Sequence, residues 1–197
     1  MTKAAHPVTK AVPVLDLTGT TCIWGRSEMG KSTVAKAAIA AALKKDKAAR
    51  QIVVIDPMSR EGTDALGVLA ALEAGAASII CNSSERAHQI GAIVYALNHS
   101  TPDNPVYVVA DEAPGYLDKP RDVLSRAVLQ GRHAGFGMLV IGQRPASVYA
   151  EYRTQAKQTI WMGLMDHTDI ETARKSLGAK ADILPNLKQG EYVKWPQ

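Results

Sequence analysis

The feature that most constrains this chain is residues 25–32, which read Gly-Arg-Ser-Glu-Met-Gly-Lys-Ser. They match the pattern G-x-x-x-x-G-K-[ST] in full, with an apolar run before them and an Ala-rich stretch after them. The two glycines let the backbone curl, so that successive N–H groups point inward at an anion. We therefore expect a strand, this loop and a helix, with the positive end of the helix dipole facing the loop.

The residue types in this loop suit the phosphates of a nucleotide. Lys31 is expected to reach the β- and γ-phosphates, and the Ser32 hydroxyl to bind Mg²⁺. The structural alternative is a Gly-containing turn with a surface lysine, which the flanking strand and helix disfavour. ATP and Mg²⁺ are thus the expected cofactors. The residues expected to contact ATP are Gly25, Arg26, Ser27, Glu28, Met29, Gly30, Lys31, Ser32 and Thr33.

A second candidate is Asp111-Glu112, which follows the apolar run 106–110. Ligands bind beyond the carboxyl ends of parallel strands, so this pair is expected beside the loop. Asp111 would support the Mg²⁺ ion, and Glu112 would polarise a water molecule in line with the γ-phosphate. The alternative is an ordinary surface acidic pair. Asp56 also ends an apolar run. Two interpretations are open for it: it lies at the same edge of the sheet, or it forms a turn with Pro57.

Apolar runs alternate with helical patterns along the chain, and this alternation predicts a doubly wound, mainly parallel α/β sheet. The expected strands are 21–24, 51–55, 78–81, 106–110, 138–141 and 159–162. The expected helices are 31–45, a segment after Ser84, a segment after Pro120 and a late helix. The late helix opens with Thr168 and Glu171 in capping-box spacing and closes at Gly178. Residues 184–195 could add a small terminal strand pair.

Residues 1–12 read as a flexible N-terminal arm, and residues 13–197 as one domain. Cys22 and Cys81 lie in apolar runs and are expected to be buried thiols in a reducing compartment. No run of about 20 apolar residues is present, so we expect no membrane segment and a protein that acts inside a cell. The net charge of +4 allows a nucleic-acid partner without requiring one.

Residues 131–145 contain two further candidates. A strand starting at Met138 would deliver Gln143 to the sheet edge, where its amide can hydrogen-bond the γ-phosphate or the attacking water. Arg132 precedes that strand at a helix end, from which it could reach the nucleotide of a neighbouring subunit. The structural alternatives are a polar residue before a turn and a helix-terminal arginine.

Three motifs follow one another along the chain: the phosphate loop, the strand ending in Asp111-Glu112, and the G-R-x-x-G…Q-R-P run. In these motifs and their order, the sequence resembles the FtsK/HerA superfamily of ring-shaped DNA-translocating ATPases. The resemblance covers residues 20–165. It implies a P-loop NTPase domain of the RecA-like (ASCE) class, with Asp111 in the Walker-B role and Glu112 as the group that activates water. It also implies that Gln143 is a sensor and Arg132 a finger supplied in trans. The rival candidates for the finger are Arg144, Arg121 and Arg153.

The size of the chain narrows this resemblance to the genome-packaging ATPases of PRD1-like phages and turreted archaeal viruses. At this length we expect neither the membrane anchor of FtsK-type pumps nor the N-terminal barrel of HerA. The resemblance implies packaging of double-stranded DNA into a preformed capsid by a homo-oligomeric ring, a hexamer with a pentamer left open. A capsid or portal-vertex partner and a location in the host cytoplasm or the virion also follow from it. Candidate phosphate contacts in the ring channel are Lys119, Arg121, Arg153 and Lys157.

Three other functions are compatible with the same motifs. One is a cellular or plasmid DNA translocase of the same superfamily. A small-molecule kinase would use the same loop, but residues 151–157 are short for a lid, and Glu112 with Gln143 suits water as the acceptor. A nucleotide-gated assembly protein that hydrolyses little ATP is the third.

Overall fold

The computed structural model describes residues 8–46, 48 and 50–196. They form a seven-stranded sheet in the order β3-β2-β4-β5-β1-β6-β7, parallel except for β7, which runs antiparallel to β6. The strands are β1 (Thr20–Trp24), β2 (Gln51–Ile55), β3 (Ser78–Cys81), β4 (Val106–Ala110), β5 (Gly137–Gly142), β6 (Gln158–Trp161) and β7 (Val193–Trp195). Every residue of β1, β4 and β5 is buried, because these strands lie inside the sheet and are covered on both faces. The predicted α/β class is confirmed.

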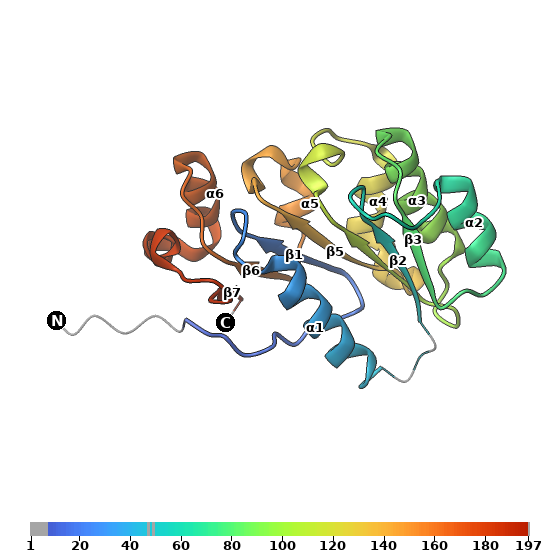
Figure 1. Cartoon of the computed structure of the whole chain (residues 1–197), viewed down its shortest axis with the longest axis horizontal. Helices are drawn as coiled ribbons and strands as arrows, with labels where there is room; N and C mark the ends of the chain where they lie inside the picture. The colour runs from blue at the N-terminus through green and yellow to red at the C-terminus, as the bar shows by residue number, and fades with distance from the viewer. Residues whose placement is uncertain (1–7, 47, 49, 197) are drawn as a thin grey trace.

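Helices cover both faces of the sheet (Figure 1). Helix α1 lies on one face and α3 and α4 on the other, with α2 beside α3. The face of α1 is also covered by the chain before β1, where the Val14 carbonyl accepts a hydrogen bond from Gln158 Nε2 at 3.0 Å. The helices are α1 (Lys31–Leu43), α2 (Ala65–Glu73), α3 (Arg86–His99), α4 (Asp122–Gln130), α5 (Ala150–Thr154) and α6 (His167–Leu177).

Helix α6 differs from its prediction at the start. Its N-cap is Asp166, whose side chain accepts hydrogen bonds from the backbone N–H groups of Thr168 and Asp169. Thr168 is therefore inside the helix, and the predicted capping box is wrong because an aspartate two residues earlier already satisfies the free N–H groups. The predicted end is confirmed, since Gly178 is the C-cap with φ 60°.

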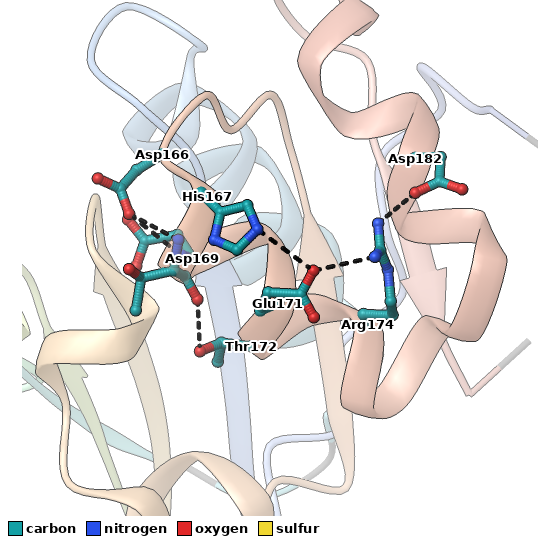
Figure 2. A network of polar contacts seen from close by, with 8 residues as sticks. Asp166, His167, Asp169, Glu171, Thr172, Arg174 and Asp182 are labelled. Carbon is teal, nitrogen blue, oxygen red and sulfur yellow. Dashed lines mark hydrogen bonds and ion pairs between the residues drawn. The ribbon is translucent and has the colours of Figure 1, made fainter.

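A polar network holds α6 against the following 3₁₀ segment, Gly178–Asn186 (Figure 2). The Arg174 guanidinium donates to Glu171 Oε1 at 2.9 Å and also pairs with Asp182. His167 lies 3.8 Å from the same Glu171 oxygen. Side chains from both elements thus hold the exposed face of the helix in place.

The two outer segments of the chain meet beside β7. Thr9 and Tyr192 exchange backbone hydrogen bonds of 3.1 and 3.0 Å, and the Tyr192 hydroxyl donates to the Ala11 carbonyl at 2.8 Å. Residues 1–7 of the expected arm lie outside the described residues. The expected terminal strand pair forms differently, because β7 pairs with β6 instead of with a second tail strand.

Both cysteines are buried free thiols, as predicted. No helix in the described part of the chain is long and apolar enough to cross a membrane.

Candidate nucleotide site

The phosphate loop joins β1 to α1 and is tied at three points to distant segments. The backbone N–H of Gly25 donates to the Gly142 carbonyl at 3.2 Å, and that of Arg26 to the Gly163 carbonyl at 2.8 Å. The Met29 carbonyl accepts from the N–H of Gly190 at 3.0 Å. The loop is therefore shaped by the ends of β5 and β6 and by the turn before β7.

The loop needs glycine at both ends for different reasons. A Cβ on Gly25 would lie 2.8 Å from Met162 Cβ, which is closer than van der Waals contact allows. Gly30 has φ 84°, in the left-handed region, and is the N-cap of α1. Glu28 adopts φ 63° without being glycine, so the loop holds a strained residue between them. The Met29 side chain is buried at 3% exposure, which leaves only its backbone to meet a ligand.

Lys31 lies across the loop. Its side chain is buried, and Nζ donates to the Arg26 carbonyl at 3.0 Å. One of its three donor hydrogens is used in this way, so two remain for phosphate oxygens. Burial lowers the pKa of Lys31, while the Glu112 and Asp111 carboxylates partly offset that effect.

Asp111 follows β4 and faces the start of α1. Its Oδ2 lies 3.5 Å from Ser32 Oγ, and its Oδ1 accepts from the Glu112 N–H at 2.9 Å. Burial raises the pKa of Asp111, and the nearby Glu112 and Asp56 carboxylates raise it further. Asp56 thus lies at the same edge, and it also forms a turn in which its side chain accepts from the Met58 N–H. Both interpretations of Asp56 are compatible with this geometry.

Glu112 has φ 49° and ψ 37°, a left-handed conformation that is strained for a residue with a Cβ. Its Oε1 accepts a hydrogen bond from Gln143 Nε2 at 3.2 Å. Gln143 follows β5, which is the neighbour of β4 in the sheet, so two adjacent strand ends deliver the two side chains to one place.

These groups line one cleft of about 320 Å³. The lining residues are Ser27, Glu28, Gly30, Lys31, Ser32, Thr33, Asp111, Glu112, Gln143 and Gln189. Ser32 and Asp111 offer the hard oxygen atoms that Mg²⁺ prefers. The described residues hold no cluster of three or more His, Cys, Asp or Glu side chains suited to a metal. Two protein oxygen ligands fit a Mg²⁺ ion whose remaining ligands come from phosphates and water.

Arg132 lies away from this cleft. It is exposed in the 3₁₀ turn Gly131–Ala134, before β5 begins, whereas Gln143 follows the end of β5. A six-residue strand separates the two ends by roughly 20 Å at about 3.3 Å per residue. Arg132 therefore cannot reach the nucleotide cleft of its own chain.

The rival arginines and the DNA-contact candidates are dispersed. Arg144 donates to Asp169 Oδ2 at 2.6 Å, which ties the end of β5 to α6. Lys157 Nζ donates to Asp16 Oδ2 at 2.9 Å at the opposite edge of the sheet. Arg153 is partly buried beside a separate cavity. Lys119 and Arg121 lie beside α5, because the Tyr152 hydroxyl donates to the Lys119 carbonyl at 3.0 Å and accepts from the Arg121 N–H at 2.8 Å.

No family model matches this sequence, and no curated protein matches it. Solved structures do match its fold. The genome packaging NTPase B204 from Sulfolobus turreted icosahedral virus 2, in complex with ATP-gammaS, is 20% identical with a TM-score of 0.71, covering 89% of this chain and 90% of that one. The DNA-packaging ATPase B204 from Sulfolobus turreted icosahedral virus is 20% identical with a TM-score of 0.67, at the same coverage.

A further match is the pCW3 conjugation coupling protein TcpA in its monomer form with ATPgS, at 16% identity and a TM-score of 0.59. It covers 90% of this chain and 59% of TcpA. This chain has the P-loop NTPase fold. The fold of the predicted superfamily and of its packaging members is thereby confirmed, while at these identities the site rests on its own geometry.

The sequence reasoning missed one residue that lines the nucleotide cleft and one that supports it. Gln189 reaches the cleft from the turn before β7, more than 150 residues after the loop it faces. Tyr116 is buried and donates from its hydroxyl to the Asp111 carbonyl at 2.9 Å, which supports the acidic pair from below. Neither has a local signal, because each depends on how distant segments pack.

Proposed function

We propose that this chain is an ATP-driven translocase of double-stranded DNA that packages a viral genome into a preformed capsid. One observation carries the hydrolytic part: Lys31, Glu112 and Gln143 line a single cleft beside the Ser32–Asp111 pair. The fold shared with packaging ATPases, one of them bound to ATP-gammaS, supports the same conclusion.

In the proposed mechanism, the loop N–H groups and Lys31 hold the phosphates of ATP. Ser32 and Asp111 would hold Mg²⁺, which when bound neutralises charge on the β- and γ-phosphates. Glu112 accepts a proton from the attacking water, and Gln143 orients that water or the γ-phosphate. Gln143 already contacts the Glu112 carboxylate. Its amide can therefore sense the state of Glu112 and that of the γ-phosphate or water.

The remaining parts of the proposal concern assembly. A homo-oligomeric ring, with a hexamer expected, would let Arg132 reach the nucleotide of the next subunit, because it cannot reach its own. DNA would pass through the ring and be held mainly by its phosphates, and a capsid or portal-vertex protein would dock the ring. The ring would work in the host cytoplasm or on the virion.

The second candidate is a cellular or plasmid translocase, favoured by the likeness in fold to the conjugation coupling protein TcpA. Both candidates require DNA-dependent ATP hydrolysis, and they differ in what the ring docks on. A packaging motor would bind empty capsids, whereas a conjugation motor would not.

The deciding experiment is steady-state ATP hydrolysis with and without long double-stranded DNA over a salt series. We expect stimulation by DNA that fades as salt rises, because phosphate contacts release counterions. A matched control is Lys31→Ala, which should remove hydrolysis in every condition. Hydrolysis that ignores DNA at every salt concentration would contradict translocation, and phosphorylation of a small acceptor would replace the proposal with a kinase.

A further inference from the structure

All three tryptophans of the chain line one cavity that is separate from the nucleotide cleft. Trp24 of β1 lies beside Trp161 of β6, and Trp195 of β7 lies beside Thr159. The strands form the floor, and the end of α5 and one side of α6 form the walls. The cavity has a volume of about 210 Å³.

Two cations lie at this cavity without a carboxylate partner. Arg153, from α5, and Lys175, from α6, both line it, and neither pairs with a carboxylate in the described part of the chain. Arg153 uses its Nε to donate to the Val148 carbonyl at 3.3 Å, which leaves the rest of its guanidinium available. Burial lowers the pKa of Arg153, and the neighbouring Cys22 offsets part of that effect.

The neighbouring cation on α6 differs from Lys175 in having carboxylate partners. Arg174 pairs with Glu171 and Asp182, the network that fixes α6 in place (Figure 2). Lys175 follows it directly in the sequence and takes no part in that network, because it lines the cavity instead. On the same helix, Arg174 is thus paired with carboxylates and Lys175 is not.

One of the tryptophans that line the cavity carries a buried donor without an acceptor. Trp161 is 4% exposed, and its indole N–H has no hydrogen-bond partner among the described residues. A buried N–H left unpaired is unfavourable, so an acceptor from a ligand would relieve that cost. Aromatic walls, an unpaired N–H and two available cations together select an anionic ligand with an apolar part.

We propose that this cavity is a docking site for an acidic peptide segment of a partner protein, with one bulky apolar side chain entering the cavity against Trp195. The flanking carboxylates of the peptide would pair with Arg153 and Lys175, and one of its carbonyls would accept from the Trp161 N–H. The anchor side chain supplies the buried contact area, as hot-spot residues do at protein interfaces.

Size and burial favour a peptide over the other anionic ligands. Small-molecule pockets span roughly 300–1,000 Å³, so a cavity of about 210 Å³ suits a single side chain while the rest of the ligand stays outside. Single-stranded nucleic acid stacks successive bases on open aromatic platforms, whereas this cavity is walled by α5 and α6 and admits one side chain. Acidic flanks then complement the two cations at the rim.

The chain carries its own reporter for this site, because tryptophan emission can only come from these three residues. The full chain, without nucleotide, is titrated with an acetylated Glu-Glu-Phe-Glu-Glu amide while the emission is recorded. We expect a saturable change, and Arg153→Ala or Lys175→Ala should weaken binding by about tenfold each through loss of one charge-assisted hydrogen bond. Lys45→Ala, an exposed lysine past the end of α1, should leave it unchanged.

A second variant tests the cavity itself. Ser176→Phe places a large side chain where the anchor would enter and should abolish binding without a change of charge. Circular dichroism melts show that each variant is folded. Emission unaffected by peptide up to about 5 mM, a limit weaker than ordinary specific recognition, would overturn the proposal. Equal binding of a peptide with Ala in place of Phe, or preferred binding of oligo-dT, would overturn it too. None of these readouts depends on ATP hydrolysis.

Discussion

Lys31 and Asp111 lie in the same cleft, and burial acts against the charge of each. It lowers the pKa of Lys31 and raises that of Asp111, so the fold disfavours the ionised forms that a nucleotide and Mg²⁺ would use. Their mutual attraction offsets part of this cost. The cleft is therefore a place where stability is given up for binding, as active sites commonly show.

Removing the lysine tests the phosphate loop directly. Lys31→Ala should reduce ATP turnover by at least about 100-fold, because in the proposed mechanism the side chain holds the phosphates on which charge develops. The measurement is steady-state phosphate release at saturating ATP. Lys36→Ala, also on α1 but outside the phosphate cleft, serves as the control and should keep turnover within about twofold. Normal turnover in Lys31→Ala would remove the loop from the mechanism.

The raised pKa of Asp111 predicts a stability effect with a definite sign. The folded state binds the Asp111 proton more readily than the unfolded state does, so the ionised carboxylate destabilises the fold at neutral pH. Asp111→Asn should raise Tm on the order of 2 °C at pH 7.5 while hydrolysis is lost. This gain should vanish as the pH falls through the folded-state pKa and below the ordinary 3.8 of an aspartate, where the carboxyl is protonated in both states.

Thermal melts of both proteins at pH 7.5 and below pH 4 measure this difference. Asp103→Asn, at an exposed aspartate, is the matched control and should change Tm little at either pH. A lower Tm for Asp111→Asn at pH 7.5 would show that the carboxylate stabilises the fold, contrary to this expectation.

Among the secondary-structure elements, those with a local signal were predicted well. The phosphate loop and the strands before it and before Asp111 are specified by spacing and by continuous apolar runs, and all six predicted strands are present within one residue at each end. Helix α2 was missed because its sequence, ALGVLAALE, is apolar all round and lacks the periodic polar face that marks a surface helix. Strand β7 was missed as a partner of β6, since three residues become a strand only by pairing.

The contact between β5 and α6 is a further case that no pattern predicts. Asp169 is 1% exposed and accepts hydrogen bonds from Arg144 Nε at 2.6 Å and from the Ala146 N–H at 3.0 Å. A buried carboxylate in such a site fixes the segment after Gln143, so Arg144 has a structural partner within its own chain.

Breaking this contact should be costly. Asp169→Ala leaves a backbone N–H unpaired and should destabilise the fold by about 2 kcal/mol, which lowers Tm by roughly 4–8 °C for a chain of this size. Thermal unfolding followed by circular dichroism measures it. Asp182→Ala, whose carboxylate is 63% exposed, should lower Tm by much less. An equal decrease of Tm in the two variants would mean that the burial of Asp169 adds nothing to the stability of the fold.

At the scale of the whole molecule, Arg132 lies apart from the nucleotide cleft of its own chain. Its position before β5 places it at the opposite end of that strand from Gln143, so a role in hydrolysis would require the nucleotide of another subunit. The sequence order could predict that it precedes the strand, but not which edge faces a neighbour, because that depends on assembly.

Mixing experiments test this placement. Arg132→Ala should keep nucleotide affinity, lose hydrolysis by about 1,000-fold, and reduce wild-type hydrolysis more than in proportion to its share of the mixture. Arg126→Ala, on the preceding helix α4, is the control and should mix without such inhibition. A loss of hydrolysis that is linear in the fraction of variant would place the catalytic unit within one chain.

The hydrogen bonds that shape the phosphate loop come from residues far along the chain. Gly163 and Gly190 both bond to the loop backbone, and Tyr192 then pairs with Thr9. During synthesis on the ribosome, the loop leaves the exit tunnel long before these partners exist. The phosphate loop is thus synthesised early, but its hydrogen bonds are among the last to form. A nascent chain stalled before residue 190 would bind ATP poorly, even with its whole motif exposed.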